Sequence, residues 1–334
     1  MMRAIRNDSV DPYFNIASDE YLVTSTDGDA FMLWQNSPAV IIGKNQNAWA
    51  EVDRAYTEEN NIAVVRRITG GGAVYHDLGN VNFSFVTPAV DGAKLNFAKF
   101  CAPVIRALSR MGIDAALDGR NDVVACGVKI SGNAECVVRN RHGYDAVLHH
   151  GTLLFSADLS ALSRALTPSR EKLSSRGIKS VSSRVGNIVD LPGYSGPRDV
   201  ADFIDILADE IAPQGMKNFT ADEVSEIERL RDEKFATWEW NRGASPAFET
   251  TKRRRFPFGT LEASFDVRGG IIEKIKITGD YFGVGAPPLE DALVGARLEA
   301  DDISSRLTDG LVSSCISGAT PRDIAELLTK EETP

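Results

Sequence analysis

The chain has 334 residues, of which 43% are hydrophobic and 25% charged, and it carries a net charge of -10 at pH 7. These values are typical of a globular protein with room for one large domain and a small one. The acidic total argues against nucleic-acid binding, which needs a basic surface, and no apolar run is long enough to span a membrane. Four cysteines without metal-ligand spacing, in a chain that starts without a signal-peptide core, favour reduced thiols and a cytoplasmic location.

The first sixty residues predict a helix followed by two strands. Apolar residues between Tyr13 and Leu22 recur at helical spacing, with Pro12 near the first turn. The runs 30–34 and 39–42 read as strands joined by the turn residues 36–38.

A glycine-rich segment follows, Arg66-Arg67-Ile68-Thr69-Gly70-Gly71-Gly72-Ala73-Val74-Tyr75-His76-Asp77-Leu78-Gly79-Asn80, between the predicted strands 62–65 and 81–86. Three consecutive glycines are costly in a strand, but they suit a backbone that turns sharply and approaches a ligand closely. Successive N–H groups then form an anion site, to which arginines add charge. A flexible hairpin turn is the structural alternative. The spacing matches neither a Walker loop nor Gly-x-Gly-x-x-Gly.

Further along, residues 93–111 predict an amphipathic helix whose apolar stripe is expected to be core. The segment 127–134, Gly-Val-Lys-Ile-Ser-Gly-Asn-Ala, pairs as a strand with 146–155 across a basic turn. Lys129 is a candidate cation aimed at an oxyanion, although a strand lysine is more often an edge residue. Asp122 could join phosphate oxygens around Mg²⁺, or belong to a simple turn. His149 could line a ligand or be a hydrogen-bonded core residue.

The remaining sequence predicts a helical layer, a linker and a small second domain. Helices are expected at 159–166, 200–211 and 221–235, and the pattern breaks at 238–248. Strands at 259–267 and 271–278 and helices at 301–307 and 321–328 then form a small α+β unit, preceded by a basic run, 252–255, that is interpreted as a solvated face. The predicted domains are 1–246, catalytic, and 247–334, accessory.

Together, the glycine-rich segment, the Lys129 strand and His149-His150-Gly151-Thr152-Leu153-Leu154 resemble the motifs of the lipoate–protein ligase A family. The resemblance extends through residues 120–122, 43–47 and the 240–248 linker, so it covers nearly the whole chain. It implies an α+β fold with a biotin-ligase-like mixed-sheet catalytic domain and a small C-terminal accessory domain.

The resemblance also implies a two-step reaction. Lipoate and ATP give lipoyl-AMP and pyrophosphate, and the lipoyl group then passes to a lysine of an acceptor lipoyl domain. The expected acceptors are the E2 subunits of 2-oxoacid dehydrogenases and the H protein of glycine cleavage. A monomer is expected, with no tightly bound cofactor.

The implied site residues fall into three groups. Lys129 contacts both substrates and is the catalytic residue. ATP is bound by the backbone of Gly72, Ala73, Val74 and Tyr75, with Arg67 on the phosphates and Asp122 on the Mg²⁺ side. The lipoate tunnel is lined by Gly71, His76, Asn80 and His149.

Three alternatives stay open. An ATP-independent octanoyl or lipoyl transferase needs a thiol nucleophile, and Cys126 is the nearest candidate, although alternation favours a core position for it. Its family carries His-x-x-Gly-Gln where this chain has His76 to Asn80. Biotin ligation is the second alternative, but the Gly-Arg-Gly-Arg loop expected for it is missing from this sequence. A non-catalytic lipoyl- or nucleotide-binding protein is the third.

Overall fold

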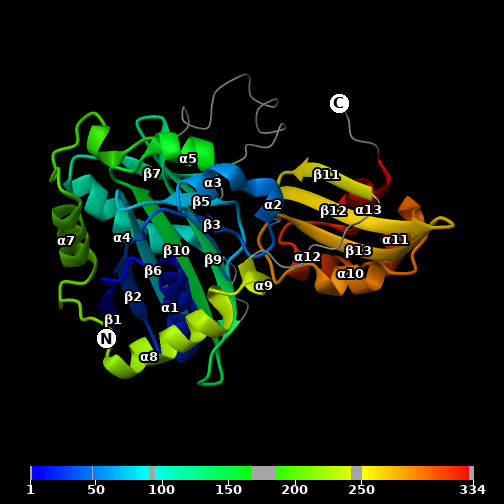
Figure 1. The fold of residues 1–334 in the computed structure, drawn as a ribbon, viewed down its shortest axis with the longest axis horizontal. Helices are drawn as coiled ribbons and strands as arrows, with labels where there is room; N and C mark the ends of the chain where they lie inside the picture. Colours follow the sequence, from blue (N-terminus) through cyan, green and yellow to red (C-terminus); the bar gives the residue numbers. More distant parts are fainter. Residues whose placement is uncertain are drawn as a thin grey trace. The chain divides into compact units, whose positions relative to one another are not determined.

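The computed structural model describes residues 2–46, 48–89, 95–119, 121–166, 185–241 and 250–330. The chain forms two compact units (Figure 1). Unit 1 comprises Met1–Ile41, Trp49–Arg66 and Val74–Asn241, and unit 2 comprises Ile42–Ala48, Arg67–Ala73 and Arg242–Pro334. Two short segments of the N-terminal half, one of them carrying the three glycines, therefore belong to the same compact unit as the C-terminal region.

The strands up to Asn241 form two sheets, and most of the predicted strands and helices are present. The strands are β1 Arg3–Arg6, β2 Ala30–Trp34, β3 Ala39–Ile42, β4 Ala63–Arg66, β5 Val74–His76, β6 Asn80–Pro88, β7 Ala115–Asp118, β8 Asp122–Ala125, β9 Val128–Arg139 and β10 Asp145–Leu154. The helices are α1 Pro12–Ser25, α2 Ala48–Glu51, α3 Arg54–Glu59, α4 Phe97–Arg110, α5 Leu159–Ala165, α7 Val200–Ile211, α8 Ala221–Leu230 and α9 Trp238–Asn241, with a π-helical turn at Arg231–Phe235.

The larger sheet is mixed, as predicted, and has the order β1-β2-β6-β10-β9-β8-β7. Only β1 and β2 pair in parallel; the other neighbours are antiparallel. The predicted pairing of the Lys129 strand with the following strand is confirmed by the β9–β10 ladder. A smaller sheet has the order β4-β3-β5.

The two faces of the larger sheet differ in character. Along β6, Val81, Phe83 and Phe85 point toward α4 and α7 and build the main apolar cluster with them. The alternate residues Asn82 and Ser84 point to the other face, where α1 packs. We refer to these as the apolar face and the polar face. Because side chains alternate along a strand, this one assignment fixes the face of each paired residue on the neighbouring strands.

Gly79 shows why the segment before β6 requires a glycine. Its carbonyl accepts hydrogen bonds from the backbone N–H groups of Phe155 (3.1 Å) and Ser156 (2.8 Å). A Cβ at this position would lie 2.2 Å from the carbonyl oxygen of Ser156, which is too close for any side chain. The glycine thus lets the chain entering β6 lie against the end of β10.

In unit 2, a three-stranded antiparallel sheet is formed by β11 Thr250–Phe256, β12 Gly259–Arg268 and β13 Ile271–Asp280. Its apolar cluster includes residues of α10 Pro287–Leu293, α11 Ala300–Arg306, α12 Asp309–Cys315 and α13 Pro321–Thr329. The small α+β unit is therefore confirmed, with two more helices than the sequence predicted.

Residues 252–255, interpreted as a solvated face, form most of β11; Arg255 is exposed as expected, whereas Lys252, Arg253 and Arg254 are partly buried. Their charges are matched locally: Arg253 pairs with Glu262 (3.5 Å), Arg254 pairs with Glu326 (3.6 Å), and Lys252 donates to the Leu328 carbonyl (2.8 Å). Ion pairing lets a basic run occupy a half-buried strand.

Residues 93–94 of the predicted helix and residues 242–248 of the linker lie outside the described residues. Among the described residues, no helix is both long and apolar enough to cross a bilayer.

The close approach at Gly79 predicts that Gly79→Ala lowers the free energy of unfolding by about 3 kcal/mol, because the backbone of Ser156 must move to admit a methyl group. Urea denaturation measures the change. Gly310→Ala is the matched control, since a Cβ there meets nothing within 4 Å. Equal stabilities for the two variants would contradict the packing argument.

Candidate functional site

Lys129 lies near the start of β9, next to an irregularity in the pairing with β8. Val123 pairs with Ser131, but Val124 pairs with Lys129, so Ile130 is an extra residue that forms a β-bulge. Ile130 is fully buried in the apolar cluster. Without the bulge, Lys129 would share the apolar face with Ser131; the extra residue turns it to the polar face.

On that face the Lys129 ammonium pairs with a carboxylate. Its Nζ lies 2.7 Å from Asp122 Oδ1, with the two side chains 32% and 38% exposed. Asp122 pairs across the ladder with Gly132, and the end of the Lys129 side chain lies over that glycine. The predicted catalytic lysine and the predicted Mg²⁺ ligand are thus direct neighbours in the half-exposed part of the sheet.

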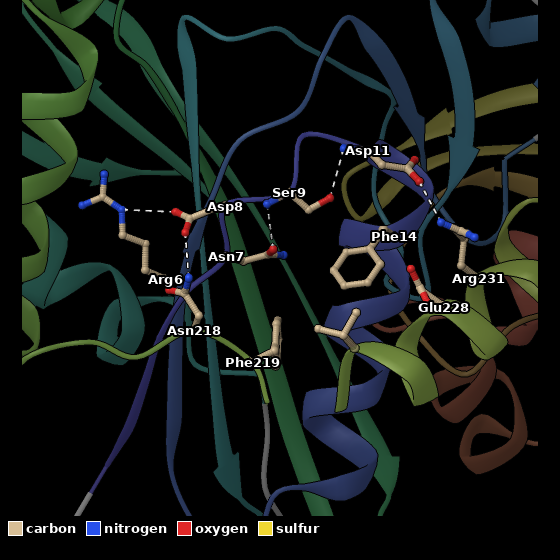
Figure 2. A pocket seen from close by; sticks show the side chains of 11 residues that line it. Arg6, Asn7, Asp8, Ser9, Asp11, Phe14, Asn218, Phe219, Glu228 and Arg231 are labelled. Atoms are coloured by element: carbon tan, nitrogen blue, oxygen red, sulfur yellow. Dashed lines mark hydrogen bonds and ion pairs between the residues drawn. The ribbon is translucent and has the colours of Figure 1, made fainter. Parts of the chain in front are cut away.

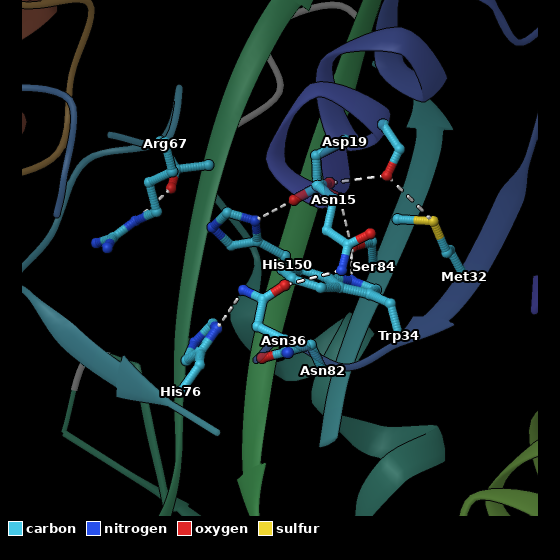
Figure 3. Close-up of polar contacts among 12 residues, drawn as sticks. Asn15, Asp19, Met32, Trp34, Asn36, Arg67, His76, Asn82, Ser84 and His150 are labelled. Carbon is cyan, nitrogen blue, oxygen red and sulfur yellow. Dashed lines mark hydrogen bonds and ion pairs between the residues drawn. The ribbon is translucent and has the colours of Figure 1, made fainter. Parts of the chain in front are cut away.

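Figure 3 shows a buried hydrogen-bond network between this face and α1. Trp34 Nε1 donates to Ser84 Oγ (3.0 Å), and Ser84 donates to Asp19 Oδ1 (2.5 Å). His150 Nδ1 lies 2.6 Å from Asp19 Oδ2. The Asp19 carboxylate is therefore held by a hydroxyl from β6 and an imidazole from β10, which compensates for its burial.

His76 and Asn80, two residues predicted to line the lipoate tunnel, belong to the same region. His76 Nδ1 lies 3.1 Å from Asn36 Nδ2, and the His76 ring meets the edge of Trp34 at 5.9 Å. Asn80 donates to Asn82 Oδ1 (2.9 Å). Asn80 Oδ1 and Asn82 Nδ2 are buried without a hydrogen-bond partner among the described residues, which is unusual for buried polar atoms.

His149, the fourth predicted lipoate contact, lies on the opposite, apolar face. Its ring stacks on Phe100 (4.9 Å) and Phe83 (5.9 Å), and its nitrogens lie 2.9 Å from Glu135 Oε1 and 3.2 Å from Asn133 Oδ1. It is fully buried, and burial lowers its pKa from the usual histidine value against the opposing effect of Glu135. The structure therefore does not bring His149 together with Lys129.

The three glycines belong to unit 2, where Arg67 organises them. The Arg67 side chain is 5% exposed and donates to Thr69 Oγ1 (2.8 Å) and to the carbonyls of Gly70 (2.7 Å) and Gly72 (2.8 Å). Because a peptide group is planar, the Ala73 N–H points away from the Gly72 carbonyl that Arg67 binds. Arg67 thus fixes the direction of the Ala73 N–H, one of the groups that the family resemblance assigns to ATP binding.

The end of β13 supports the same loop. The Gly71 N–H donates to the Tyr281 carbonyl (3.2 Å), and the Gly71 backbone has a φ of 90° that suits glycine. A Cβ on Gly70 would lie 2.3 Å from the Tyr281 carbonyl oxygen, and one on Gly72 would lie 3.2 Å from Asp280 Oδ2. All three glycines therefore satisfy a conformational or packing requirement in this unit.

Val74 and Tyr75, the other two residues assigned to ATP, form β5 with His76 and pair with Ile41 and Val40. Burial raises the pKa of Tyr75 to about 12, so its phenol stays protonated at neutral pH. Arg66 acts structurally: its Nε donates to the Trp240 carbonyl (3.0 Å), and Trp240 Nε1 donates back to the Arg66 carbonyl (2.8 Å).

A separate pocket of about 350 Å³ lies in unit 1 between the start of α1 and α8 (Figure 2). Both of its arginines face carboxylates: Arg6 Nε lies 3.6 Å from Asp8 Oδ1, and Arg231 Nη1 lies 3.5 Å from Asp11 Oδ2. These pairs leave little net positive charge for an anionic ligand, and the pocket contains none of the predicted site residues.

The expectation that Cys126 belongs to the core is wrong, because Cys126 is exposed. Cys126 and Gly127 form the tight turn between β8 and β9, with φ values of 50° and 78°. Two consecutive left-handed residues are typical of a two-residue hairpin turn, which lies outside the strand alternation used for the prediction.

The predicted Mg²⁺ site has a single carboxylate, that of Asp122. Among the described residues no group of three or more His, Cys, Asp or Glu side chains is placed to hold a metal ion. Mg²⁺ commonly uses one or two carboxylates together with substrate phosphates, so Asp122 fits this role only with a bound nucleotide.

Comparisons with known proteins agree with the fold and the motifs. A family model for the lipoyl protein ligase A/B catalytic domain matches residues 11–212, and one for the bacterial lipoate protein ligase C-terminus matches residues 245–328. Lipoate–protein ligase 1 of Staphylococcus aureus is 39% identical over 315 residues, covering 92% of this chain and 94% of that protein. The lipoate-protein ligase LplJ of Bacillus subtilis is 38% identical over 327 residues, covering 95% and 97%.

Solved structures give the same result. LipL1 of P. falciparum in complex with lipoate has a TM-score of 0.73 at 26% identity, covering 92% of this chain and 94% of that one. A bipartite lipoate protein ligase of Thermoplasma acidophilum, from a structural analysis of that ligase and its E2 lipoyl domain, has a TM-score of 0.60 at 28% identity, covering 74% and 98%. A lipoate-protein ligase A bound with ATP has 0.58 at 28% identity, covering 72% and 98%.

The fold is therefore that of the lipoate ligases, which are enzymes, with a mixed sheet and a small C-terminal sheet domain. The chain belongs to the lipoate–protein ligase family.

Sequence reasoning missed the buried polar partners of the site: Asp19, Trp34, Asn82 and Ser84. The signal that could have found Asn82 and Ser84 is their alternation with Val81, Phe83 and Phe85, which places polar groups on one face of a buried strand. Asp19 had no such signal, because its partners come from strands distant in sequence.

The Arg67 bonds predict that Arg67→Lys raises the KM for ATP about tenfold, since a lysine keeps the charge but lacks the planar, spread donors that reach two carbonyls and a hydroxyl at once. Steady-state lipoylation assays at varied ATP measure it, with the KM for lipoate as the internal control. An unchanged KM for ATP would show that the loop does not depend on the guanidinium.

For His149, the lowered pKa has a consequence for stability. The unfolded chain binds the proton more readily than the folded one, so stability decreases as the pH falls below about 6.5, the ordinary value for histidine. His149→Gln keeps polar partners for Glu135 but does not titrate. We expect its urea midpoint to depend less on pH between 7 and 5 than that of the wild type; identical slopes would exclude this role.

Proposed function

We propose that this lipoate–protein ligase activates lipoate with ATP and transfers the lipoyl group to a lysine of a lipoyl domain. The observation that carries the proposal is the Lys129 ammonium on the polar face of the sheet, half-exposed beside Asp122 in a chain of this family. A carboxylate is a poor electrophile, so amide formation requires its prior activation as a mixed anhydride.

In the first step, a lipoate carboxylate oxygen attacks the α-phosphorus of ATP. The bond between the α-phosphorus and the oxygen leading to the β-phosphate breaks, and pyrophosphate leaves. Two anions must approach each other, so electrostatic stabilisation and positioning supply most of the catalysis. Lys129, with one positive charge and three N–H donors, binds the carboxylate and the α-phosphate together.

The nucleotide is held by the glycine loop in this proposal. Gly72, Ala73, Val74 and Tyr75 offer backbone N–H groups to the phosphates. Arg67 acts from beneath the loop, through the carbonyls it binds. The ATP-bound structure of a related ligase supports nucleotide binding at this fold.

Asp122 would hold a Mg²⁺ ion that accompanies the ATP phosphates, and the ion would supply positive charge that neutralises part of the phosphate charge. Asp122 also pairs with Lys129, so the carboxylate and the ammonium lie at the same place on the sheet.

Lipoate contacts are proposed for Gly71, His76, Asn80 and His149. The contact proposed for Asn80 is supported by its buried Oδ1, which has no hydrogen-bond partner in the described part of the chain, while its amide donates to Asn82. His149 lies on the apolar face, so its contribution comes through the packing of that side of the sheet.

In the second step, the neutral amine of the acceptor lysine attacks the acyl carbon, AMP leaves, and an amide forms. The proposed acceptors are lipoyl domains of 2-oxoacid dehydrogenase E2 subunits and the glycine cleavage H protein. A related ligase described together with its E2 lipoyl domain supports this class of partner. We further propose a catalytic domain at 1–246, an accessory domain at 247–334, a monomer, and a cytoplasmic location consistent with four unbridged cysteines.

The alternative is ATP-independent acyl transfer through a thiol. The exposed position of Cys126 leaves it accessible, which keeps this alternative testable. Cys126→Ser should retain full ATP-dependent lipoylation; loss of activity would favour the transferase.

The central prediction concerns Lys129→Ala. Removing the ammonium should lower the rate of lipoate-dependent ATP–pyrophosphate exchange by about 10²–10³-fold, comparable to the loss of one oxyanion donor. Melting temperature should change little, because the Asp122 pair is half-exposed and such pairs contribute little to stability. Exchange at the wild-type rate would refute the role of Lys129, and an absence of exchange in the wild type would refute adenylation.

A further inference from the structure

Gly132 is a glycine inside a strand, where glycine is unfavourable. It lies in β9 and pairs with Asp122 on β8. It is not among the residues of positive φ, so its backbone conformation is open to any residue. A strand glycine of this kind commonly marks a close approach of another group.

The group that approaches Gly132 is the catalytic lysine itself. A Cβ at this position would lie 3.1 Å from Lys129 Nζ and 3.2 Å from Lys129 Cε, with no other non-adjacent atom of the described residues within 4 Å. The glycine thus leaves room for the end of the Lys129 side chain to lie flat on the strand.

Three features then determine where the ammonium lies. The bulge at Ile130 turns Lys129 to the polar face, Gly132 leaves the surface beneath its Nζ open, and Asp122 pairs with it from the neighbouring strand. The bulge sets the direction of the Lys129 side chain, and Asp122 attracts its charge. Only Gly132 acts by leaving space, so it controls how closely the ammonium lies to the sheet.

We propose that Gly132 is a positioning residue for Lys129: the missing side chain sets the location of the ammonium that binds the two substrate anions. The inference rests on the proposed catalytic role of Lys129. A methyl group at 132 displaces the ammonium without disturbing the fold, because the atoms that a Cβ meets belong to the flexible end of one lysine.

The test is a substitution series, Gly132→Ala and Gly132→Val, in the full chain. A Cβ at 132 requires the ammonium to move by a few tenths of an ångström. Because a displacement of about 1 Å can reduce catalysis about 10²-fold, we expect kcat for lipoyl-AMP formation to fall about threefold with alanine and about 10²-fold with valine, whose methyl groups reach further. The melting temperature of Gly132→Ala should match that of the wild type. Gly310→Ala, which meets nothing within 4 Å, is the control and should leave kcat unchanged.

A double-mutant cycle with Lys129→Ala separates positioning from a general effect on the strand. If Gly132 acts through the lysine, adding Gly132→Ala to Lys129→Ala causes no further loss of kcat. Additive losses, or wild-type kcat in both Gly132 variants, would overturn the inference. Wild-type exchange by Lys129→Ala would instead overturn the proposed function, so the two failures are distinguishable.

Discussion

The face on which each side chain of the large sheet lies is the constraint on which the site depends. Both faces are covered, one by an apolar cluster and the other by α1, so a side chain on the wrong face would be buried among the wrong partners. One extra residue, Ile130, reverses the alternation and sends Lys129 to the polar face. Burying an unpaired ammonium in the apolar cluster would cost far more than a local irregularity in the ladder.

The polar groups on that face are tolerated because they satisfy one another. Asp19 accepts from Ser84 and pairs with His150, and Trp34 donates to Ser84. Each group comes from a different element, so the network ties α1 to three strands of the sheet. A satisfied network of this kind also fixes side-chain orientations, which a site for a small acid requires.

The glycine loop differs from the polar face, because its proposed function depends on backbone N–H groups rather than on side chains. Arg67 binds the carbonyls of Gly70 and Gly72, and the end of β13 packs where side chains would otherwise project. A buried cation beneath a loop orients its carbonyls inward and its N–H groups outward. The resulting row of outward N–H groups suits a polyanion.

The sequence by itself determined the elements with strong periodicity. Strands 30–34 and 39–42 and the helix at 200–211 agree with β2, β3 and α7, and the pairing of β9 with β10 follows from two alternating runs and a turn. Its motifs also determined the family, because those residue types at that spacing are highly specific. Local pattern was sufficient for these features because each depends on neighbours in the chain.

Tertiary structure decided the rest. The partial burial of Arg253 and Arg254 in the basic run depended on pairing with Glu262 on the neighbouring strand and with Glu326 far along the chain. Strand register decided that His150, and not His149, lies on the polar face. The direction of the Lys129 side chain depended on the extra residue, Ile130. Alternation has a period of two, so a single inserted residue reverses it, and only the pairing with β8 reveals that the insertion is there.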